Sequence, residues 1–207
     1  MFTEFRVRWV ALCLVLLAGL AAASTDSPYD IIRLTADELT ERLDGRRDYL
    51  AQNPAELYGL IDAVLLPRFD TRYAGYLVLG KRNWRAASEV QRTRFVDAFY
   101  GFLLRSYADA VLKFDQSQIK VEASDQADDG KRAVVRTTMR LDDGSDVPVN
   151  YSMRNSEQGW RAYDVRIEGV SYVQNYRNQF AAEIDANGID AVIARLESEQ
   201  PDIMRAQ

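Results

Sequence analysis

The stretch YDVRIEGVSYVQNY, residues 163–176, decides the fold because a strand pattern and a helix pattern meet in it. Its first half alternates apolar and polar residues, which is typical of a β-strand. Gly169 then indicates a turn, and after it large apolar residues return at the spacing of a helix. The sequence therefore predicts a strand-to-helix junction that is rich in large side chains. These side chains are Tyr163, Val165, Ile167, Val170, Tyr172 and Tyr176.

Before this junction the apolar pattern repeats every two residues, which predicts consecutive strands. Short turn sequences such as Asp128-Asp129-Gly130 and Gln158-Gly159 separate the strands. Because short turns join antiparallel neighbours, we expect a four-stranded antiparallel meander. The predicted strands are residues 119–121, 131–141, 147–153 and 160–167.

Helical patterns stand on both sides of the meander. Thr35 and Glu38 have the spacing of a capping box, which predicts a helix from residue 36, after a flexible lead-in over residues 24–30. Asn53-Pro54 indicates a second helix start, and Gly80 a helix end. The predicted helices are residues 36–50, 54–65, 70–79, 88–114, 171–186 and 189–200.

The longest predicted helix, residues 88–114, carries a broad apolar stripe that can cover one face of the meander. Such a stripe normally packs into a core, although aromatic faces also line binding cavities. The expected fold class is therefore α+β, with an antiparallel four-stranded meander packed against several helices. The stripe includes Phe95, Phe99, Phe102, Leu103 and Tyr107.

The first 23 residues have the order of a secretory signal peptide, with Arg6 and Arg8 before an apolar run and three alanines after it. The run is shorter than the ~20 residues of a membrane helix. We expect cleavage after Ala23, which removes Cys13, the only cysteine, and leaves residues 24–207 as one exported domain. That domain has 24 basic and 30 acidic side chains, so its net charge of -6 disfavours nucleic acids and anionic lipid surfaces.

The amino-acid composition excludes most catalytic and metal-binding sites. The chain has no histidine, so it cannot form a Ser-His or Cys-His nucleophile or an ordinary zinc or iron site. Residues 142–146, DDGSD, are the best calcium candidate, but they lack the distal Glu of an EF-hand, which favours a solvated turn. Asp164 and Glu168 remain as a carboxylate pair for acid–base chemistry, and solvated surface positions are their ordinary alternative.

Two segments resemble the MlaC family of periplasmic phospholipid-shuttle proteins, also called toluene-tolerance proteins. Residues 77–114 contain a Leu-Gly helix end, Trp84 and the Phe-rich helix. Residues 147–180 contain, in order, Gly159-Trp160, Tyr163-Asp164-Val165 and Glu168-Gly169-Val170-Ser171, and Asn187-Gly188-Ile189-Asp190 follows them. Gly75-Tyr76 departs from the more ordinary helix residues expected there.

The resemblance implies a curved sheet packed on helices, with an apolar cavity between them that takes acyl chains while the headgroup stays near solvent. It implies a carrier of phospholipid between the outer and inner membranes, which maintains the lipid asymmetry of the outer membrane. The implied partners are an outer-membrane lipoprotein complex and an inner-membrane ABC transporter with its periplasmic lipid-binding subunit. No metal and no cofactor beyond the phospholipid cargo is implied.

On this reading the cavity wall combines the aromatic helix, the inward faces of the strands and a rim at the junction. The candidate lipid-binding residues are Phe95, Phe99, Phe102, Leu103, Tyr107, Val149, Tyr151, Met153, Tyr163, Val165, Ile167, Val170, Tyr172 and Tyr176. Ordinary core packing is the alternative for each of them. For the whole protein, the alternatives are a periplasmic enzyme that uses Asp164 and Glu168, and a non-catalytic adaptor without a cavity.

Overall fold

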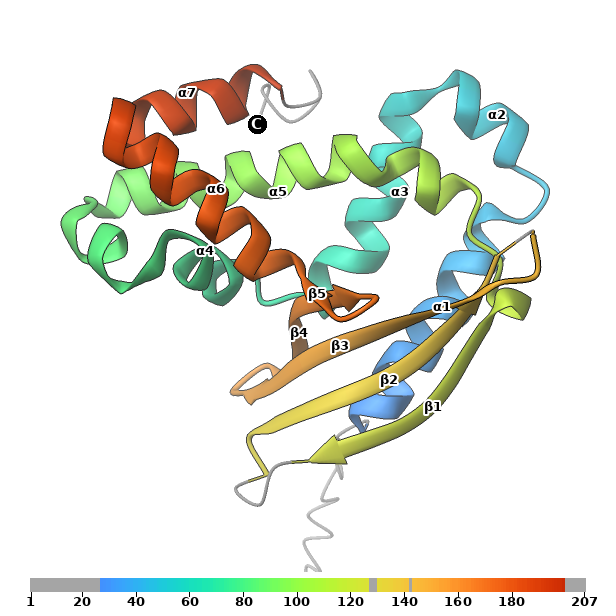
Figure 1. Cartoon of the computed structure of the whole chain (residues 1–207). Coiled ribbons are helices and arrows are strands. Elements are labelled where there is room, and N and C mark those ends of the chain that lie inside the picture. The colour runs from blue at the N-terminus through green and yellow to red at the C-terminus, as the bar shows by residue number, and fades with distance from the viewer. Residues whose placement is uncertain (1–26, 127–129, 142, 200–207) are drawn as a thin grey trace, which may run out of the picture.

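The computed structural model describes residues 27–126, 130–141 and 143–199, and the predicted signal peptide lies outside them. The described chain forms helices, then an antiparallel sheet, then two more helices (Figure 1). The helices are α1 Pro28–Leu43, α2 Arg47–Gln52, α3 Pro54–Leu65, α4 Thr71–Ala86, α5 Glu89–Leu112, α6 Tyr172–Asn187 and α7 Ile189–Ser198, with short 3-10 helices η1 Leu66–Arg68 and η2 Gln116–Gln118. The strands are β1 Ile119–Gln126, β2 Arg132–Arg140, β3 Asp146–Ser156, β4 Gly159–Ile167 and β5 Val170–Ser171.

The sheet confirms the predicted α+β class. Its strands follow the order β1-β2-β3-β4-β5, and every neighbouring pair is antiparallel. Two details differ from the expected four-stranded meander. β1 continues to Gln126 past a register shift after Val121, and such an irregularity interrupts simple alternation. β5 exists because a tight turn at Glu168 and Gly169, both with positive φ, returns the chain to pair with β4.

Helix α1 covers one face of the sheet and lies behind β1–β3 in Figure 1. Ile31 and Ile32 of α1 are buried there against a cluster of strand side chains. At ~25 cal/mol per Å² of apolar surface removed from water, this contact stabilises both the helix and the sheet. The strand residues of this cluster are Ala133, Val135, Met153, Trp160 and Ala162.

The beginning of α1 differs from the prediction. Ser27 caps the helix, since its hydroxyl oxygen accepts a hydrogen bond from the Asp30 N–H at 3.1 Å. Thr35 is inside the helix, where its hydroxyl donates to the Ile31 carbonyl at 2.6 Å. The predicted capping box at Thr35 is therefore wrong, and so is the predicted flexible lead-in from Pro28 onward, because these residues already belong to α1. Gly45, with φ 65°, lies between α1 and α2.

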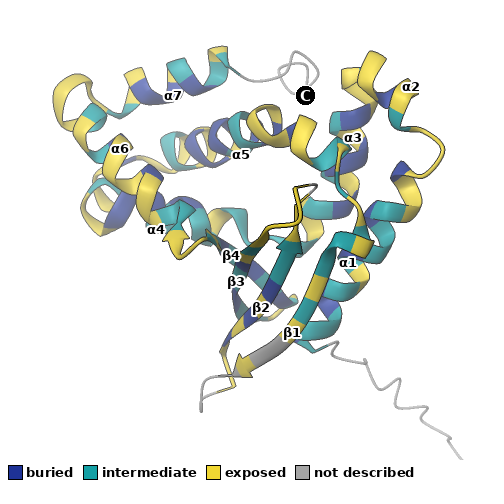
Figure 2. Ribbon diagram, turned by 45° about the vertical axis from the view of Figure 1, so that its right-hand side comes forward, coloured by how far each residue is buried: buried dark blue, intermediate teal, exposed yellow. Residues whose placement is uncertain are grey.

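Helix α5 is the centre of the helical part. Its predicted capping box is confirmed: the Ser88 hydroxyl accepts from the Gln91 N–H, and the Gln91 side chain accepts from the Ser88 N–H. In Figure 1, α7 and α4 lie on opposite sides of α5, and α6 crosses in front of it. These four helices enclose an aromatic core in which Phe95 and Phe180 are fully buried. Figure 2 shows dark-blue buried segments on these helices.

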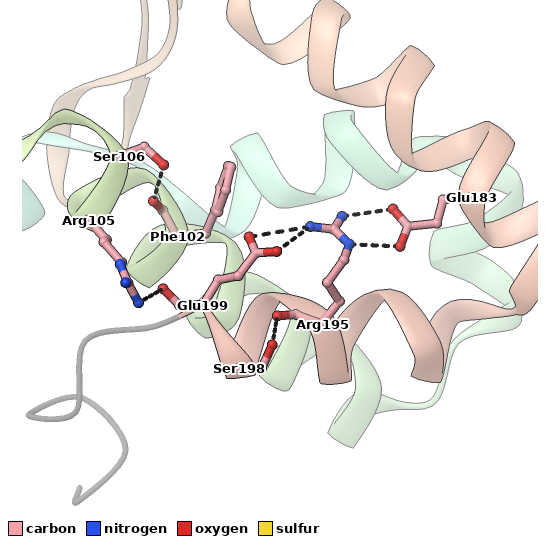
Figure 3. A network of polar contacts seen from close by, with 7 residues as sticks. All are labelled: Phe102, Arg105, Ser106, Glu183, Arg195, Ser198 and Glu199. Carbon is pink, nitrogen blue, oxygen red and sulfur yellow. Dashed lines mark hydrogen bonds and ion pairs between the residues drawn. The ribbon is translucent and has the colours of Figure 1, made fainter.

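A bidentate ion pair fixes α6 to α7 (Figure 3). Arg195 donates to the two carboxylate oxygens of Glu183 at 2.8 and 2.7 Å and to Glu199 at 3.2 Å. Its guanidinium also lies over the ring of Phe180, 5.7 Å from the centroid. The hydrogen bond from Arg195 lowers the pKa of Glu183 and the same contact raises the pKa of Arg195. Both groups therefore stay charged, and α6 has a fixed position on the helical core.

Candidate functional site

An apolar cavity of about 280 Å³ lies between the helices and β4. Helix α5 forms its longest wall, and α3, α4, α6 and β4 complete it. Within the described lining, Asp164 is the one charged side chain. The wall contributed by α5 consists of Val96, Phe99, Tyr100, Leu103, Leu104, Tyr107 and Val111.

Eight of the fourteen candidate residues line this cavity. They come from α5, from β4 and from the start of α6, so the structure brings together the aromatic helix and the strand-to-helix junction. The eight are Phe99, Leu103, Tyr107, Tyr163, Val165, Ile167, Tyr172 and Tyr176.

Two aromatic candidates on α5 lie instead in the helical core. Phe95 is fully buried, and its ring packs edge to face on Phe180, with 5.9 Å between centroids. Phe102 packs against the same core and meets the ring of Tyr176 at 5.8 Å. Both lie on the side of α5 that packs against α6 and α7. The cavity borders a neighbouring side of the same helix.

The β3 candidates and Val170 also lie outside the cavity wall. Met153 and Tyr151 pack in the cluster beneath α1, and Val149 is buried opposite Ile167 of β4. β4 is the strand next to α6, so β3 is one strand too far from the helices that enclose the cavity. Val170 is 58% exposed, because it directly follows the tight turn before β5.

Sequence reasoning missed the wall contributed by α3, η1 and α4. The apolar spacing in residues 57–65 predicted a helix with one buried face, and that signal was correct. It did not indicate that the face borders a cavity, since burial has the same spacing in either case. The missed residues outside α5 are Ile61, Leu65, Phe69, Thr71, Ala74 and Val173.

Three tyrosines form a rim where α5 meets α6. The hydroxyls of Tyr107 and Tyr176 share a hydrogen bond of 3.2 Å. The ring of Tyr172 lies 5.7 Å from that of Tyr107 and 6.3 Å from that of Tyr176. Burial and the Tyr176 hydroxyl raise the pKa of Tyr107 to about 12. The Tyr107 hydroxyl is therefore uncharged at neutral pH, and the rim offers hydroxyls beside an apolar interior.

Asp164 holds the start of α6 against β4. Its Oδ1 accepts from the Val173 N–H at 3.0 Å, and its Oδ2 accepts from the Ser171 hydroxyl at 2.7 Å. Arg166 Nε lies 3.6 Å from the same carboxylate, which is only 6% exposed. Because its oxygens are occupied by these donors, Asp164 caps a helix rather than presenting a free acid or base.

Glu168, the second residue of the carboxylate alternative, is exposed at the turn, with φ 51°. Glu168 is solvent-exposed, whereas Asp164 is buried under α6. The two carboxylates therefore have different structural environments, and the enzyme alternative has no support from their arrangement.

Tyr163 owes its position to a β-bulge. On β4, Ala162 pairs with Met153 and Asp164 pairs with Ser152 of β3, so Tyr163 is the extra residue. Its ring contacts Tyr73 of α4 edge to face, with 5.1 Å between centroids. The bulge breaks the simple alternation expected for this strand and brings β4 into contact with α4.

A second groove, more open and more polar, lies where α4, β4 and the turn before β5 meet α6. Its volume is about 550 Å³, and it shares Tyr163, Asp164 and Val173 with the apolar cavity. We assign the candidate site to the smaller cavity, because a large apolar lining in a helical interior is the feature that ordinary packing would remove.

The described part of the chain offers neither a cluster of metal ligands nor a membrane-spanning helix. No group of three or more His, Cys, Asp or Glu side chains there is placed to hold a metal ion. In the calcium candidate, Asp142 lies outside the described residues, and Asp143 accepts hydrogen bonds from Ser145 at 2.9 and 2.6 Å. None of the described helices has both the length and the apolar character needed to cross a bilayer.

Comparisons with known proteins find relatives along most of the chain. The family model described as MlaC protein matches residues 33–198. Toluene tolerance protein Ttg2D of Pseudomonas putida is 30% identical over 179 residues, which cover 86% of this chain and 83% of that protein. The intermembrane phospholipid transport system binding protein MlaC of Haemophilus influenzae is 26% identical over 196 residues, which cover 93% and 91% of the two chains.

A solved structure has the same architecture. It is a phospholipid-binding protein from Ralstonia solanacearum in complex with a phospholipid, with a TM-score of 0.75 and 25% sequence identity. The match covers 84% of this chain and 97% of that chain. The curled sheet and its helices are therefore shared with a protein whose structure contains a phospholipid.

Proposed function

The chain belongs to the MlaC family, and from that premise we propose that it is a non-catalytic carrier that encloses the acyl chains of a phospholipid in its apolar cavity. The observation that carries this proposal is the nearly all-apolar lining formed by α3, α4, α5, α6 and β4. The phospholipid in the related Ralstonia structure supports it.

The physical need for such a carrier follows from the hydrophobic effect. Burial of one methylene is worth about 0.8 kcal/mol, so a lipid with roughly 30 methylenes gains over 20 kcal/mol when its chains leave water. Non-covalent affinities saturate near ~20 kcal/mol. Opening the cavity and ordering the chains must therefore consume part of the gain, and this also permits release of the lipid.

The cavity is small for a phospholipid, so lipid binding requires it to open. Pockets for drug-sized ligands have volumes of about 300–1,000 Å³, and this cavity, at about 280 Å³, lies just below that range. A two-chain lipid is larger than a drug, so the helices must separate to admit it. The boundary between α5 and α6, where the tyrosine hydrogen bond of 3.2 Å is the polar link, is the place for this opening.

We place this activity in the periplasm, between the outer and inner membranes, where the carrier maintains outer-membrane lipid asymmetry. The signal-like first 23 residues support export, and the Haemophilus relative is described as part of an intermembrane phospholipid transport system. The proposed partners are an outer-membrane lipoprotein complex and an inner-membrane ABC transporter with its periplasmic lipid-binding subunit. They supply the competition for lipid that release requires.

Organic extraction of the purified protein, followed by mass spectrometry, tests the proposal. We expect phospholipid in near-stoichiometric amount after purification without added lipid. Protein that is folded but empty, and that takes up no phospholipid from vesicles, would contradict the carrier and favour the adaptor alternative.

A matched pair of variants locates the lipid. Leu103→Trp adds bulk to the cavity wall, so it should lower lipid occupancy at least fivefold while circular dichroism stays unchanged. Val170→Glu is the control, because Val170 is exposed and lies outside the cavity wall. Equal occupancy in Leu103→Trp and the unmodified protein would contradict our placement of the acyl chains.

A further inference from the structure

The polar groove between α4, β4 and α6 shares part of its wall with the apolar cavity. Its volume is about 550 Å³, and Tyr163, Asp164 and Val173 line both spaces. The two spaces are therefore neighbours at the start of α6. A headgroup joined to acyl chains in the cavity has this groove within its reach.

Arg177 of α6 gives the groove a charge that the protein does not balance. Its side chain lines the groove and is exposed to solvent. Among the described residues, none forms a hydrogen bond or an ion pair with its guanidinium. The other arginine of the groove, Arg166, lies 3.6 Å from the Asp164 carboxylate. The unbalanced charge is therefore that of Arg177 alone.

A kink in α4 makes room for this side chain. Gly80 has φ 72° at the kink, and a Cβ added to it would lie 3.2 Å from Nη2 and 3.3 Å from Nε of Arg177. The guanidinium thus lies against the backbone of α4, where a side chain on residue 80 would crowd it. This close approach places the cation at the groove wall without neutralising it.

The groove has little to balance a positive group on a ligand. Within the described lining, Asp164 is the one carboxylate, and the Ser171 hydroxyl and the Val173 N–H already donate to it. Glu168 stands at the adjacent turn, exposed and outside the lining. Amide side chains, whose N–H groups can donate to phosphate oxygens, complete the polar wall. They are Gln174, Asn175 and Asn178.

We propose that Arg177 binds the phosphate ester of the lipid headgroup, and that the carrier consequently prefers anionic phospholipids to zwitterionic ones. The inference rests on the proposed carrier function. Guanidinium groups form charge-assisted hydrogen bonds with phosphate oxygens, and Arg177 repels a cationic group attached to the same phosphate. The negative charge of the whole chain matters less, because charges more than about 8 Å apart are largely screened at physiological ionic strength.

The preference concerns the kind of lipid more than its amount. Burial of the acyl chains contributes the same free energy whichever headgroup they carry. Two lipids with identical chains and the same phosphate, one with an uncharged and one with a cationic headgroup, therefore isolate the effect of the groove.

Competition between two such lipids tests the inference. The purified protein is incubated with an excess of vesicles that contain equal parts of dioleoyl phosphatidylglycerol and dioleoyl phosphatidylcholine. Protein is then separated from vesicles, and its bound lipids are counted by mass spectrometry. We expect phosphatidylglycerol to exceed phosphatidylcholine about threefold, as suits one exposed charge contact.

Neutral variants of Arg177 make the test specific. Arg177→Gln should bring the ratio of the two bound lipids close to one. Arg177→Met, which keeps an apolar stem against α4, is the second neutral variant if circular dichroism reveals misfolding of the first. Arg85→Gln removes an exposed charge of α4 outside the groove lining and should keep the threefold preference. The same ratio in Arg177→Gln and the unmodified protein would overturn the inference.

A free phosphate ion is the other source of this chemistry. Calorimetric binding of inorganic phosphate that disappears in Arg177→Gln, together with no lipid preference, would assign the groove to the ion and overturn the headgroup assignment. Uptake of both lipids in equal amounts would contradict the inference alone. A folded protein that takes up neither lipid would contradict the carrier proposal, and the inference with it.

Discussion

Asp164 shows how one buried charge can organise a site without acting in chemistry. It accepts from the Val173 N–H and the Ser171 hydroxyl, and the Ser171 oxygen in turn accepts from the Gln174 N–H at 3.0 Å. This chain of bonds satisfies amides that the first turn of α6 would otherwise leave unpaired. Since α6 carries Tyr172 and Tyr176, the carboxylate positions part of the cavity rim.

The first prediction removes this carboxylate. Asp164→Ala leaves buried donors without an acceptor, so the free energy of unfolding should fall by about 2–3 kcal/mol. Glu168→Gln, at the exposed turn, is the matched control and should change it by less than about 0.5 kcal/mol. Urea denaturation measures both, and similar midpoints for the two variants would contradict the anchoring role.

The second prediction concerns alkaline pH. Burial raises the pKa of Tyr151 from 10.0 to about 12. A raised folded-state pKa means that the stabilising contribution is complete below pH 10 and is lost as the pH rises toward 12. In Tyr151→Phe, the melting temperature should therefore decrease less between pH 9 and pH 11 than in the unmodified protein. Parallel decreases in the two proteins would show that the Tyr151 phenol is not shielded.

At the scale of elements, α4 and α5 approach closely at Gly75, which explains the residue that departs from the expected family pattern. A Cβ added to Gly75 would lie 2.7 Å from Cγ2 of Val96, a residue of the cavity wall. No larger residue fits there unless the Val96 side chain or α5 shifts. The glycine thus sets the distance between two walls of the cavity.

The third prediction follows from this contact. Gly75→Ala should lower the free energy of unfolding by about 1–3 kcal/mol through overpacking, and adding Val96→Ala should recover part of the loss. Gly59→Ala is the matched control, because Gly59 lies on the exposed side of α3 and an added Cβ would have no atom within 4 Å. In that control the free energy of unfolding should rise by about 0.5–1 kcal/mol, as expected when alanine replaces glycine within a helix. Equal effects of the two substitutions in chemical denaturation would exclude the close approach.

For the molecule as a whole, a phospholipid that binds only the folded protein should raise the stability of the fold. A ligand present at 100 times its dissociation constant stabilises the folded state by about 2.7 kcal/mol. For a domain of this size, about 2–4 °C correspond to each kcal/mol. The fourth prediction is that complete delipidation lowers the melting temperature by roughly 5–10 °C, and that added phospholipid restores it. Calorimetry with equal melting temperatures for both forms would contradict this coupling.

Local patterns predicted most of the elements because their causes are local. Ser88 and Gln91 cap α5 as their spacing indicates, and alternation over the strands predicted an antiparallel meander. Gly80 was predicted to end a helix, and its φ of 72° does interrupt α4, although the chain continues as helix to Ala86. The start of α1 was missed, because Thr35 and Glu38 match a capping box while Ser27 caps the helix two turns earlier.

The sequence by itself determined the α+β class, the order of the elements and the family, since periodicity, turn residues and motif order are properties of the chain. Only the tertiary structure decided which buried side chains face a cavity. Phe95 and Phe99 are one helical turn apart on α5, yet Phe95 is enclosed by α4 and α6 and Phe99 borders the cavity. Periodicity reports that a side chain leaves water, and the packing of distant segments decides whether it meets another side chain or an open space.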